Sequence, residues 1–216
     1  MTILDYSLYL ILDPWLAPGR PLSELAEEAI EGGVSMLQLR CKGEKAREFF
    51  ELAREIREVS HRHGVPLIIN DRLDIALATG AGGVHVGQED LPAGETRRIL
   101  PQDMILGVSA ASLEEAKEAE RMGASYIGLG SIFATSSKPD AGKPIGTERI
   151  AEVSRTVEIP IVAIGGIQVA NAEEVIEKGA SGVAVISAIL QAKDPKAAAR
   201  HLRTIIERAK AKRISP

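Results

Sequence analysis

The chain has 216 residues, of which 45% are hydrophobic and 3% aromatic, and its formal net charge is -4. The acidic balance and the few aromatic rings argue against nucleic-acid binding, which needs clustered cations and stacking platforms. Cys41 is the single cysteine of the sequence, which excludes an intrachain disulfide and a cysteine zinc cluster. The N-terminal apolar run has no basic segment before it and is too short to span a bilayer, so we expect a cytoplasmic protein without a membrane partner.

Apolar runs of strand length alternate with amphipathic helical stretches along the chain. The expected strands are residues 7–12, 34–40, 66–70, 83–87, 104–109, 125–130, 160–165 and 182–187. The expected helices are residues 22–33, 44–64, 72–80, 93–100, 112–123, 147–157, 171–179 and 194–212. Continuous runs of Val, Ile and Leu are typical of parallel strands that are buried on both faces.

A repeat of two β–α units supports a closed sheet. The second, fourth, sixth and eighth strands follow helices that end in glycine, in EGGVSML, TGAGGVHV, MGASYIGL and KGASGVAV, whereas the third and seventh follow Pro66 and Pro160. Such self-similarity indicates a quasi-symmetric parallel sheet, and eight units in this length predict a (β/α)8 TIM barrel. We expect one domain over residues 1–216. An open, doubly wound sheet is the alternative, but no G-x-G-x-x-G follows the first strand.

Polar residues gather after the strands, where a barrel enzyme carries its chemistry, whereas the opposite strand ends show mostly glycine and proline. The strand-end residues are Asp13, Gln38, Arg40, Lys42, Asn70, Asp71, His85, Gln88, Asp90, Ser109, Thr135, Ser136, Ser137, Lys138, Gly165, Gly166 and Ser187. This asymmetry predicts a functional site at the carboxyl ends of the strands. His85, inside an apolar strand, is expected to be largely a hydrogen-bonded core residue.

The segment QLRCK predicts an anion site. Alternate residues of a strand face opposite sides, so Gln38, Arg40 and Lys42 share one face, toward the barrel mouth. Two cations at the mouth require an anion. For Lys42 alone, a charged strand end in solvent is the simpler interpretation.

Asp71 and Asp90 end neighbouring strands and predict a cation site. Two close carboxylates either share a proton or bind a cation, and hard oxygen ligands without cysteine favour Mg²⁺ with substrate phosphates and water. The alternative is that Asp71 caps the helix that follows it, as aspartate often does. Asp74, one turn further on, is expected to support the turn or Arg72.

The seventh and eighth strands end in IVAIGGI and VAVISAIL. In barrels these two loops commonly bind phosphate through backbone N–H groups and a short extra helix, which here begins at Ser187. Gly166 would allow a close backbone approach, although a turn glycine needs no ligand. The long loop 134–146 adds the hydroxyls of Thr135 and Ser137, and Lys138, which on its own would read as a solvated lysine.

Seven motifs in order resemble the thiamine phosphate synthase family: QLRCK, NDRLDIA, GVHVGQEDL, GVSAASLEEA, SYIGLGSIF-T-SK, IPIVAIGGI and GVAVISAI. The resemblance runs from Tyr9 to Ile189. It implies a (β/α)8 barrel and a transferase that joins hydroxymethylpyrimidine diphosphate to thiazole phosphate. The products would be thiamine phosphate and pyrophosphate. The resemblance also implies loss of diphosphate first, followed by capture of the pyrimidine cation by the thiazole nitrogen.

The resemblance assigns roles to individual residues. The diphosphate would be gripped by Gln38, Arg40, Lys42, Ser109 and Lys138, of which the last four also serve catalysis. Asn70 would contact the pyrimidine, and Asp71 and Asp90 would hold Mg²⁺. The thiazole phosphate would be held by Thr135, Ser136, Ser137, Gly166, Ile186 and Ser187.

Three positions depart from the family pattern. Ala111 stands where the family often has histidine, and Ser131 and Ala134 stand where proline is usual. Two alternatives stay open. One is the thiazole tautomerase of the same fold, which uses a histidine at that position, and the other is a non-catalytic phosphate-binding barrel. The expected partners are two small-molecule substrates, and the sequence leaves a homo-oligomer open.

Overall fold

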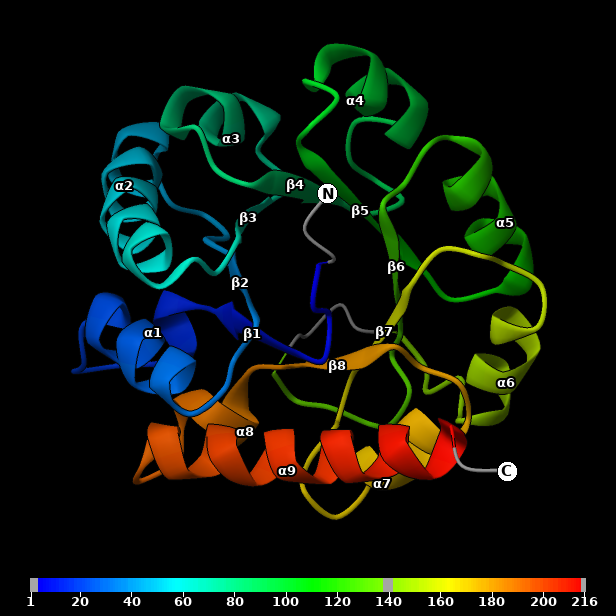
Figure 1. Ribbon diagram of the computed structural model, residues 1–216. Helices are drawn as coiled ribbons and strands as arrows, with labels where there is room; N and C mark the ends of the chain where they lie inside the picture. The colour runs from blue at the N-terminus through cyan, green and yellow to red at the C-terminus, as the bar shows by residue number, and fades with distance from the viewer. Residues whose placement is uncertain (1–3, 138–141, 215–216) are drawn as a thin grey trace.

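The computed structural model describes residues 4–137 and 142–214. In that part of the chain, eight parallel strands close into a barrel in sequence order, and β8 pairs with β1 (Figure 1). The strands are β1 (Leu8–Leu12), β2 (Met36–Leu39), β3 (Leu67–Asn70), β4 (Gly83–Val86), β5 (Ile105–Ala110), β6 (Tyr126–Gly130), β7 (Ile161–Ile164) and β8 (Gly182–Val185). The (β/α)8 barrel is therefore confirmed, and the open sheet is wrong.

Helices follow the strands and form an outer ring (Figure 1). They are η1 (Pro14–Leu16), α1 (Leu22–Glu31), α2 (Ala46–His63), α3 (Leu73–Thr79), α4 (Ala93–Ile99), α5 (Leu113–Arg121), α6 (Glu148–Ser154), α7 (Ala172–Glu177), α8 (Ser187–Leu190) and α9 (Pro195–Ile214). The short helix expected at Ser187 is present as α8. The 3-10 turn η1 was not predicted. It starts because Asp13 accepts the Trp15 N–H and Pro14 has a fixed φ suited to a first turn.

The glycines of the repeat close the helices as expected. Gly33, Gly80, Gly123 and Gly179 all have positive φ, between 61° and 117°. Only glycine adopts this conformation without strain, so each helix stops there and the chain turns into the next strand. The local sequence signal and the backbone geometry agree at all four positions.

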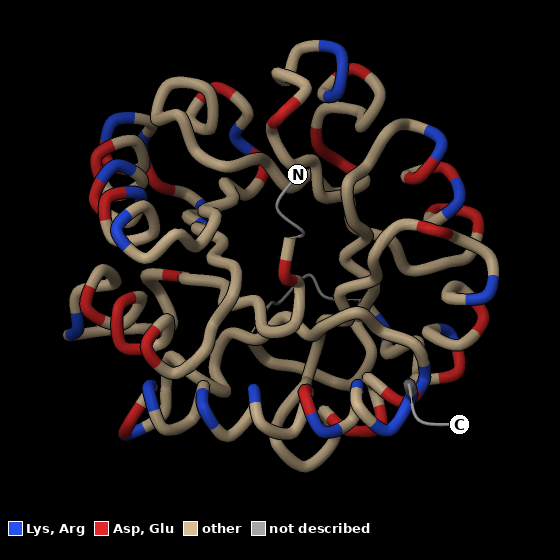
Figure 2. Tube along the Cα trace, viewed as in Figure 1, with Lys and Arg blue, Asp and Glu red and all other residues tan. Residues whose placement is uncertain are grey.

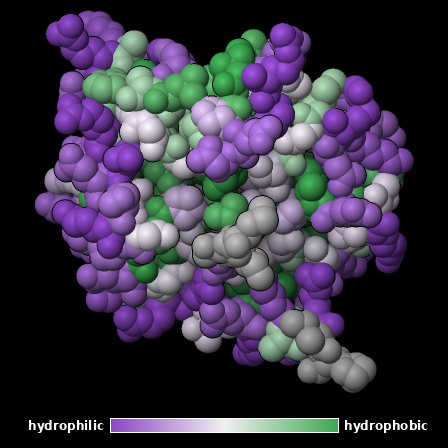
Figure 3. All heavy atoms as spheres, turned by 45° about the horizontal axis from the view of Figure 1, so that its top comes forward, coloured by the Kyte–Doolittle hydropathy of each residue, from purple (hydrophilic) through white to green (hydrophobic). Residues whose placement is uncertain are grey.

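The core has two layers, one inside the barrel and one between the barrel and the helices. In β2, Leu37 and Leu39 are fully buried and alternate with Gln38, which faces the interior cavity. Charged residues lie on the helical ring, and the strands carry few of them (Figure 2). Hydrophilic side chains accordingly dominate the rim of the face in Figure 3. In the described ranges, none of the helices has the length and apolar character to cross a membrane.

Gly182 is a point where strand closure leaves no room for a side chain. A Cβ there would lie 1.7 Å from Tyr6 O and 2.8 Å from Ser7 O, both backbone atoms. We expect Gly182→Ala to lower the free energy of unfolding by about 3 kcal/mol or more, since overpacked backbone cannot relax locally. Gly64→Ala is the control, because no atom lies within 4 Å of its Cβ position and only its φ of 67° is unfavourable. Denaturant unfolding that gives the same loss for both variants would contradict this account.

Candidate active site at the carboxyl ends of the strands

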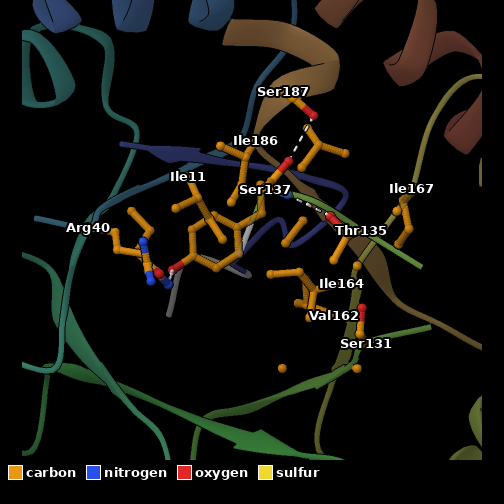
Figure 4. Close-up of a pocket in the computed structure, with 18 of the residues that line it drawn as sticks. Ile11, Arg40, Ser131, Thr135, Ser137, Val162, Ile164, Ile167, Ile186 and Ser187 are labelled. Atoms are coloured by element: carbon orange, nitrogen blue, oxygen red, sulfur yellow. Dashed lines mark hydrogen bonds between the residues drawn. The ribbon is translucent and has the colours of Figure 1, made fainter. Parts of the chain in front are cut away.

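A cavity of about 250 Å³ opens at the carboxyl ends of the strands. Its walls are built from residues two apart on the strands, because alternate side chains point inward. The lining residues on the strands or directly after them include Tyr9 and Ile11, Gln38 and Arg40, Tyr126 and Gly128, Val162 and Ile164, and Ala184 and Ile186. Figure 4 shows several of them around the cavity. The structure thus brings together side chains that are up to 178 positions apart in the sequence (Tyr9 and Ser187).

Arg40 is a fixed cation on the cavity wall, beside Gln38 as predicted. Its Nη1 lies 2.6 Å from Asp13 Oδ2, and the two side chains are 11% and 2% exposed. The other oxygen of Asp13 accepts the backbone N–H of Trp15 at 3.0 Å. Asp13 therefore braces Arg40 from the turn η1. The sequence placed Asp13 at a strand end, but no role was predicted for it.

Lys42 reaches the neighbouring strand end instead of standing free in solvent. Its Nζ lies 2.5 Å from Asp71 Oδ2, and the side chain of Lys42 is 51% exposed. The carboxyl of Asp90 lies within hydrogen-bonding reach of Asp71, and Asp90 Oδ2 accepts the Gly87 N–H at 2.7 Å. Burial raises the pKa of Asp71, the Lys42 hydrogen bond opposes that shift, and Asp90 adds to it. The bond to Asp71 in turn raises the pKa of Lys42.

The alternative that Asp71 caps α3 is wrong. The residue before α3 is Arg72, and that helix start has no side-chain cap. Asp71 has a φ of 62°, a region that aspartate tolerates better than most residues, and its N–H donates to His85 O at 2.8 Å. This turn points its carboxylate toward Lys42. Asp74, as expected, pairs with Arg72.

The carboxylate pair fits one hard cation whose other ligands come from elsewhere. In residues 4–137 and 142–214, no group of three or more His, Cys, Asp or Glu could hold a metal. Two adjacent carboxylates repel one another when both are ionised, and a bound cation relieves that repulsion. Such a pair suits Mg²⁺, which usually takes one or two carboxylates together with phosphate and water oxygens. Magnesium stays a prediction for Asp71 and Asp90.

A second polar group lines the opposite wall. Ser137 Oγ donates to Ser187 Oγ at 3.0 Å, and the Ser137 N–H donates to Thr135 Oγ1 at 3.2 Å (Figure 4). Ser136, Gly166 and Ile186 line the same cavity. The loops after β6, β7 and β8 therefore converge as the sequence predicted. Lys138, with part of loop 134–146, lies outside the described residues.

Gly166 does allow a close backbone approach, although the neighbour seen is another loop. Gly166 has a φ of 63°, and a Cβ there would lie 2.4 Å from Ala134 O and 2.9 Å from Phe133 Cβ. Gly165, with a φ of 101°, would place a Cβ 1.9 Å from Ser131 Oγ. Both glycines are required because the segment after β6 lies directly on the segment after β7.

Sequence reasoning missed two tyrosines of the cavity floor. Tyr9 and Tyr126 line the cavity, and their hydroxyls lie 2.9 Å apart. His85 is buried and hydrogen-bonded, as expected of a core residue, but it also lines the cavity beside Ser109. The signal was available, because Tyr9 stands two residues before Ile11 on the inward face of β1.

The fold and the cavity define a (β/α)8-barrel protein with two separate polar walls at the carboxyl end of the barrel. A family model described as thiamine monophosphate synthase matches residues 8–189. The thiamine-phosphate synthase of Moorella thermoacetica is 52% identical over 208 residues, which cover 96% of this chain and 99% of that protein. The thiamine-phosphate synthase of a Roseiflexus species is 49% identical over 202 residues, covering 94% and 86%.

A solved structure agrees with these relatives. The thiamine phosphate pyrophosphorylase of Pyrococcus furiosus superposes with a TM-score of 0.88 at 41% identity, covering 95% of this chain and 98% of that one. The chain belongs to the thiamine monophosphate synthase family.

Proposed function

We propose that this chain is a thiamine phosphate synthase, which joins hydroxymethylpyrimidine diphosphate to thiazole phosphate and releases pyrophosphate. One observation carries the proposal: Gln38, Arg40 and Asn70 line one side of a single cavity as a cationic wall, and hydroxyls of the loops after β6 and β8 line the other. The Lys42–Asp71 ion pair lies at the strand ends that adjoin the cationic wall. Two anionic substrates can therefore be bound at once, with their reacting carbon and nitrogen held between the walls. Positioning of this kind removes most of the entropic barrier of a two-substrate reaction.

The cationic wall is assigned to the diphosphate. Arg40 and Lys42 neutralise charge that grows on the departing diphosphate, with Lys138 added from loop 134–146. Arg40 is braced by Asp13, so little reorganisation is needed when the charge develops. Gln38, Asn70 and Ser109 line the same side and hold the pyrimidine and its first phosphate.

Asp71 and Asp90 would hold Mg²⁺ beside this wall. A bound Mg²⁺ would supply charge neutralisation to the diphosphate oxygens. Residues of this chain orient the two carboxylates. The Asp71 turn directs one carboxylate toward Lys42, and the Gly87 N–H holds the other by a hydrogen bond. Lys42 offsets one of the two carboxylate charges through its ion pair with Asp71.

The hydroxyl wall is assigned to the thiazole phosphate. Ser137 and Ser187 face one another across two loops, with Thr135 and Ser136 beside them, and Gly166 and Ile186 complete the wall. In this arrangement the thiazole nitrogen faces the carbon that loses diphosphate and captures the cation. No side chain has to act as a nucleophile.

The tautomerase alternative needs a proton-transfer group that is missing. The family relative uses a histidine at the position of Ala111, and a methyl group can neither donate nor accept a proton. A non-catalytic barrel would have no use for a carboxylate pair facing a cationic wall. A cytoplasmic location and any homo-oligomeric state stay predictions.

An assay with both purified substrates, with and without Mg²⁺, tests the proposed synthase activity. Failure to form thiamine phosphate in either condition would refute it.

The division into two walls has its own test. Ser187→Asp places a carboxylate where the monophosphate should bind, so we expect KM for the thiazole phosphate to rise about tenfold or more through like-charge repulsion. Arg40→Ala should instead raise KM for the diphosphate substrate. Ser23→Asp, which adds the same charge in α1 away from the cavity, is the control. Steady-state kinetics in which each cavity variant affects both substrates equally would contradict the division.

A further inference from the structure

Five side chains form a continuous hydrogen-bonded chain across the floor of the cavity. Gln38 Nε2 lies 3.0 Å from Tyr9 Oη, and Tyr9 Oη lies 2.9 Å from Tyr126 Oη. Tyr126 Oη lies 2.8 Å from His85 Nδ1, and His85 Nε2 lies 2.8 Å from Ser109 Oγ. The members come from β2, β1, β6, β4 and β5, and all five line the cavity.

The barrel makes room for the middle of this chain with two glycines. A Cβ at Gly107 would lie 2.3 Å from Tyr126 Oη and 2.4 Å from His85 Nδ1, the two atoms of the central bond. A Cβ at Gly128 would lie 2.9 Å from His85 Cε1. Any other residue at Gly107 would displace the hydrogen bond between Tyr126 and His85. The absence of a side chain at this position therefore leaves the space that the bond occupies.

Each member of the chain after Gln38 has a single proton to donate. Burial raises the pKa of Tyr9 and of Tyr126 well above the ordinary value, so each phenol keeps its single proton. A neutral imidazole also has one N–H, and a hydroxyl donates once. The direction of the first hydrogen bond therefore fixes which atom donates in each of the following ones.

The donor order follows from Gln38, whose amide nitrogen donates to Tyr9. Tyr9 then donates to Tyr126, because a Tyr126 proton aimed at Tyr9 would leave the Tyr9 proton without an acceptor among the hydrogen bonds of the described residues. A buried donor without an acceptor is costly. Tyr126 consequently donates to His85 Nδ1, and the imidazole proton lies on Nε2 and is donated to Ser109 Oγ.

We propose that Tyr126 is a positioning residue that fixes the Nε2–H tautomer of His85 and thereby leaves the Ser109 hydroxyl as a donor toward the diphosphate substrate. Ser109 Oγ accepts from His85, so its own proton is free for an acceptor in the cavity. A diphosphate substrate presents mainly acceptor atoms on this side. This inference rests on the proposed function and adds a residue that acts through two others.

The tautomer is measured directly on the wild-type chain. Nitrogen-15 NMR of histidine-labelled protein, with the His85 signals identified by their loss in His85→Gln, should show protonated Nε2 and unprotonated Nδ1. A proton on Nδ1, or on both nitrogens, overturns the proposal. This measurement requires no activity, so it separates failure of the proposal from failure of the proposed function.

Kinetics test the consequence. Tyr126→Phe removes the donor to His85, and we expect KM for the diphosphate substrate to rise roughly five- to tenfold, the loss of about one oriented hydrogen bond. KM for the thiazole phosphate should stay within about twofold. Tyr6→Phe is the matched control, since the Tyr6 ring lies 5.3 Å from that of Tyr126 but its hydroxyl is not a member of the chain. Equal effects on both substrates, or equal effects of the two variants, overturn the proposal. If Tyr126→Phe fails to fold, the wild-type tautomer decides.

Discussion

Asp71→Asn and Asp90→Asn are each expected to lower kcat by about 10³-fold, because each removes one negative ligand from the cation that the diphosphate shares. Excess chelator should produce a similar loss in the wild-type protein, and added Mg²⁺ should reverse it. Steady-state rates across a range of Mg²⁺ concentrations measure both effects. Full activity of the wild type in excess chelator would end the assignment of Mg²⁺ to Asp71 and Asp90.

Asp74→Asn is the matched control for these substitutions. Asp74 lies in the first turn of α3, is 63% exposed and pairs with Arg72, so it belongs to the same segment but not to the carboxylate pair. Its exposed ion pair is worth about 1 kcal/mol at most. We expect kcat within about twofold of the wild type. A loss like that of Asp71→Asn would mean that any charge change in this segment disturbs the site.

Loss of activity in Asp71→Asn should come without loss of stability. Burial raises the pKa of Asp71 above its unfolded value, so its contribution to stability is present at low pH and is lost as pH rises through the folded pKa. At neutral pH the ionised carboxylate is therefore not a net stabiliser, and an uncharged amide of the same shape should not lower Tm. A thermal melt at neutral pH with a clearly lower Tm would contradict this reasoning.

Lys138→Ala is expected to lower kcat by about 10²-fold with a smaller change in KM. The residue lies outside the described part of the chain, but it directly follows Ser137, which lines the cavity and bonds to Ser187. An ammonium that meets the departing oxygen acts mainly in the transition state, so kcat is the sensitive constant. Lys138→Arg should restore the rate only in part, because the planar guanidinium group of arginine spreads its charge more widely than the compact ammonium group of lysine.

Lys143→Ala provides the control within the same loop. Lys143 is exposed on the far arm of loop 134–146, and its loss should leave kcat within about twofold of the wild type. Rates are compared at saturating thiazole phosphate. If Lys138→Ala behaves like Lys143→Ala, then Lys138 is an ordinary solvated lysine.

The sequence by itself predicted the fold and the end of the barrel at which the candidate site lies. Period-two alternation in QLRCK places Gln38 and Arg40 on the inward face, and glycines at the ends of helices mark the repeat; both are local consequences of backbone geometry. Polar residues at strand ends could be collected because all parallel strands of a barrel end on the same face. The carboxylate pair and the loops after β6, β7 and β8 were found in this way.

Only the tertiary structure decided which of these groups touch. Asp13 braces Arg40 across 27 positions, Tyr126 meets His85 across 41, and Tyr9 meets Tyr126 across 117. Taken alone, Asp71 looked better suited to capping a helix, but its positive φ, a property of the turn, directs it to Lys42 instead. Partners so far apart depend on the register in which the strands pair, since a shift by one residue turns every side chain to the opposite face.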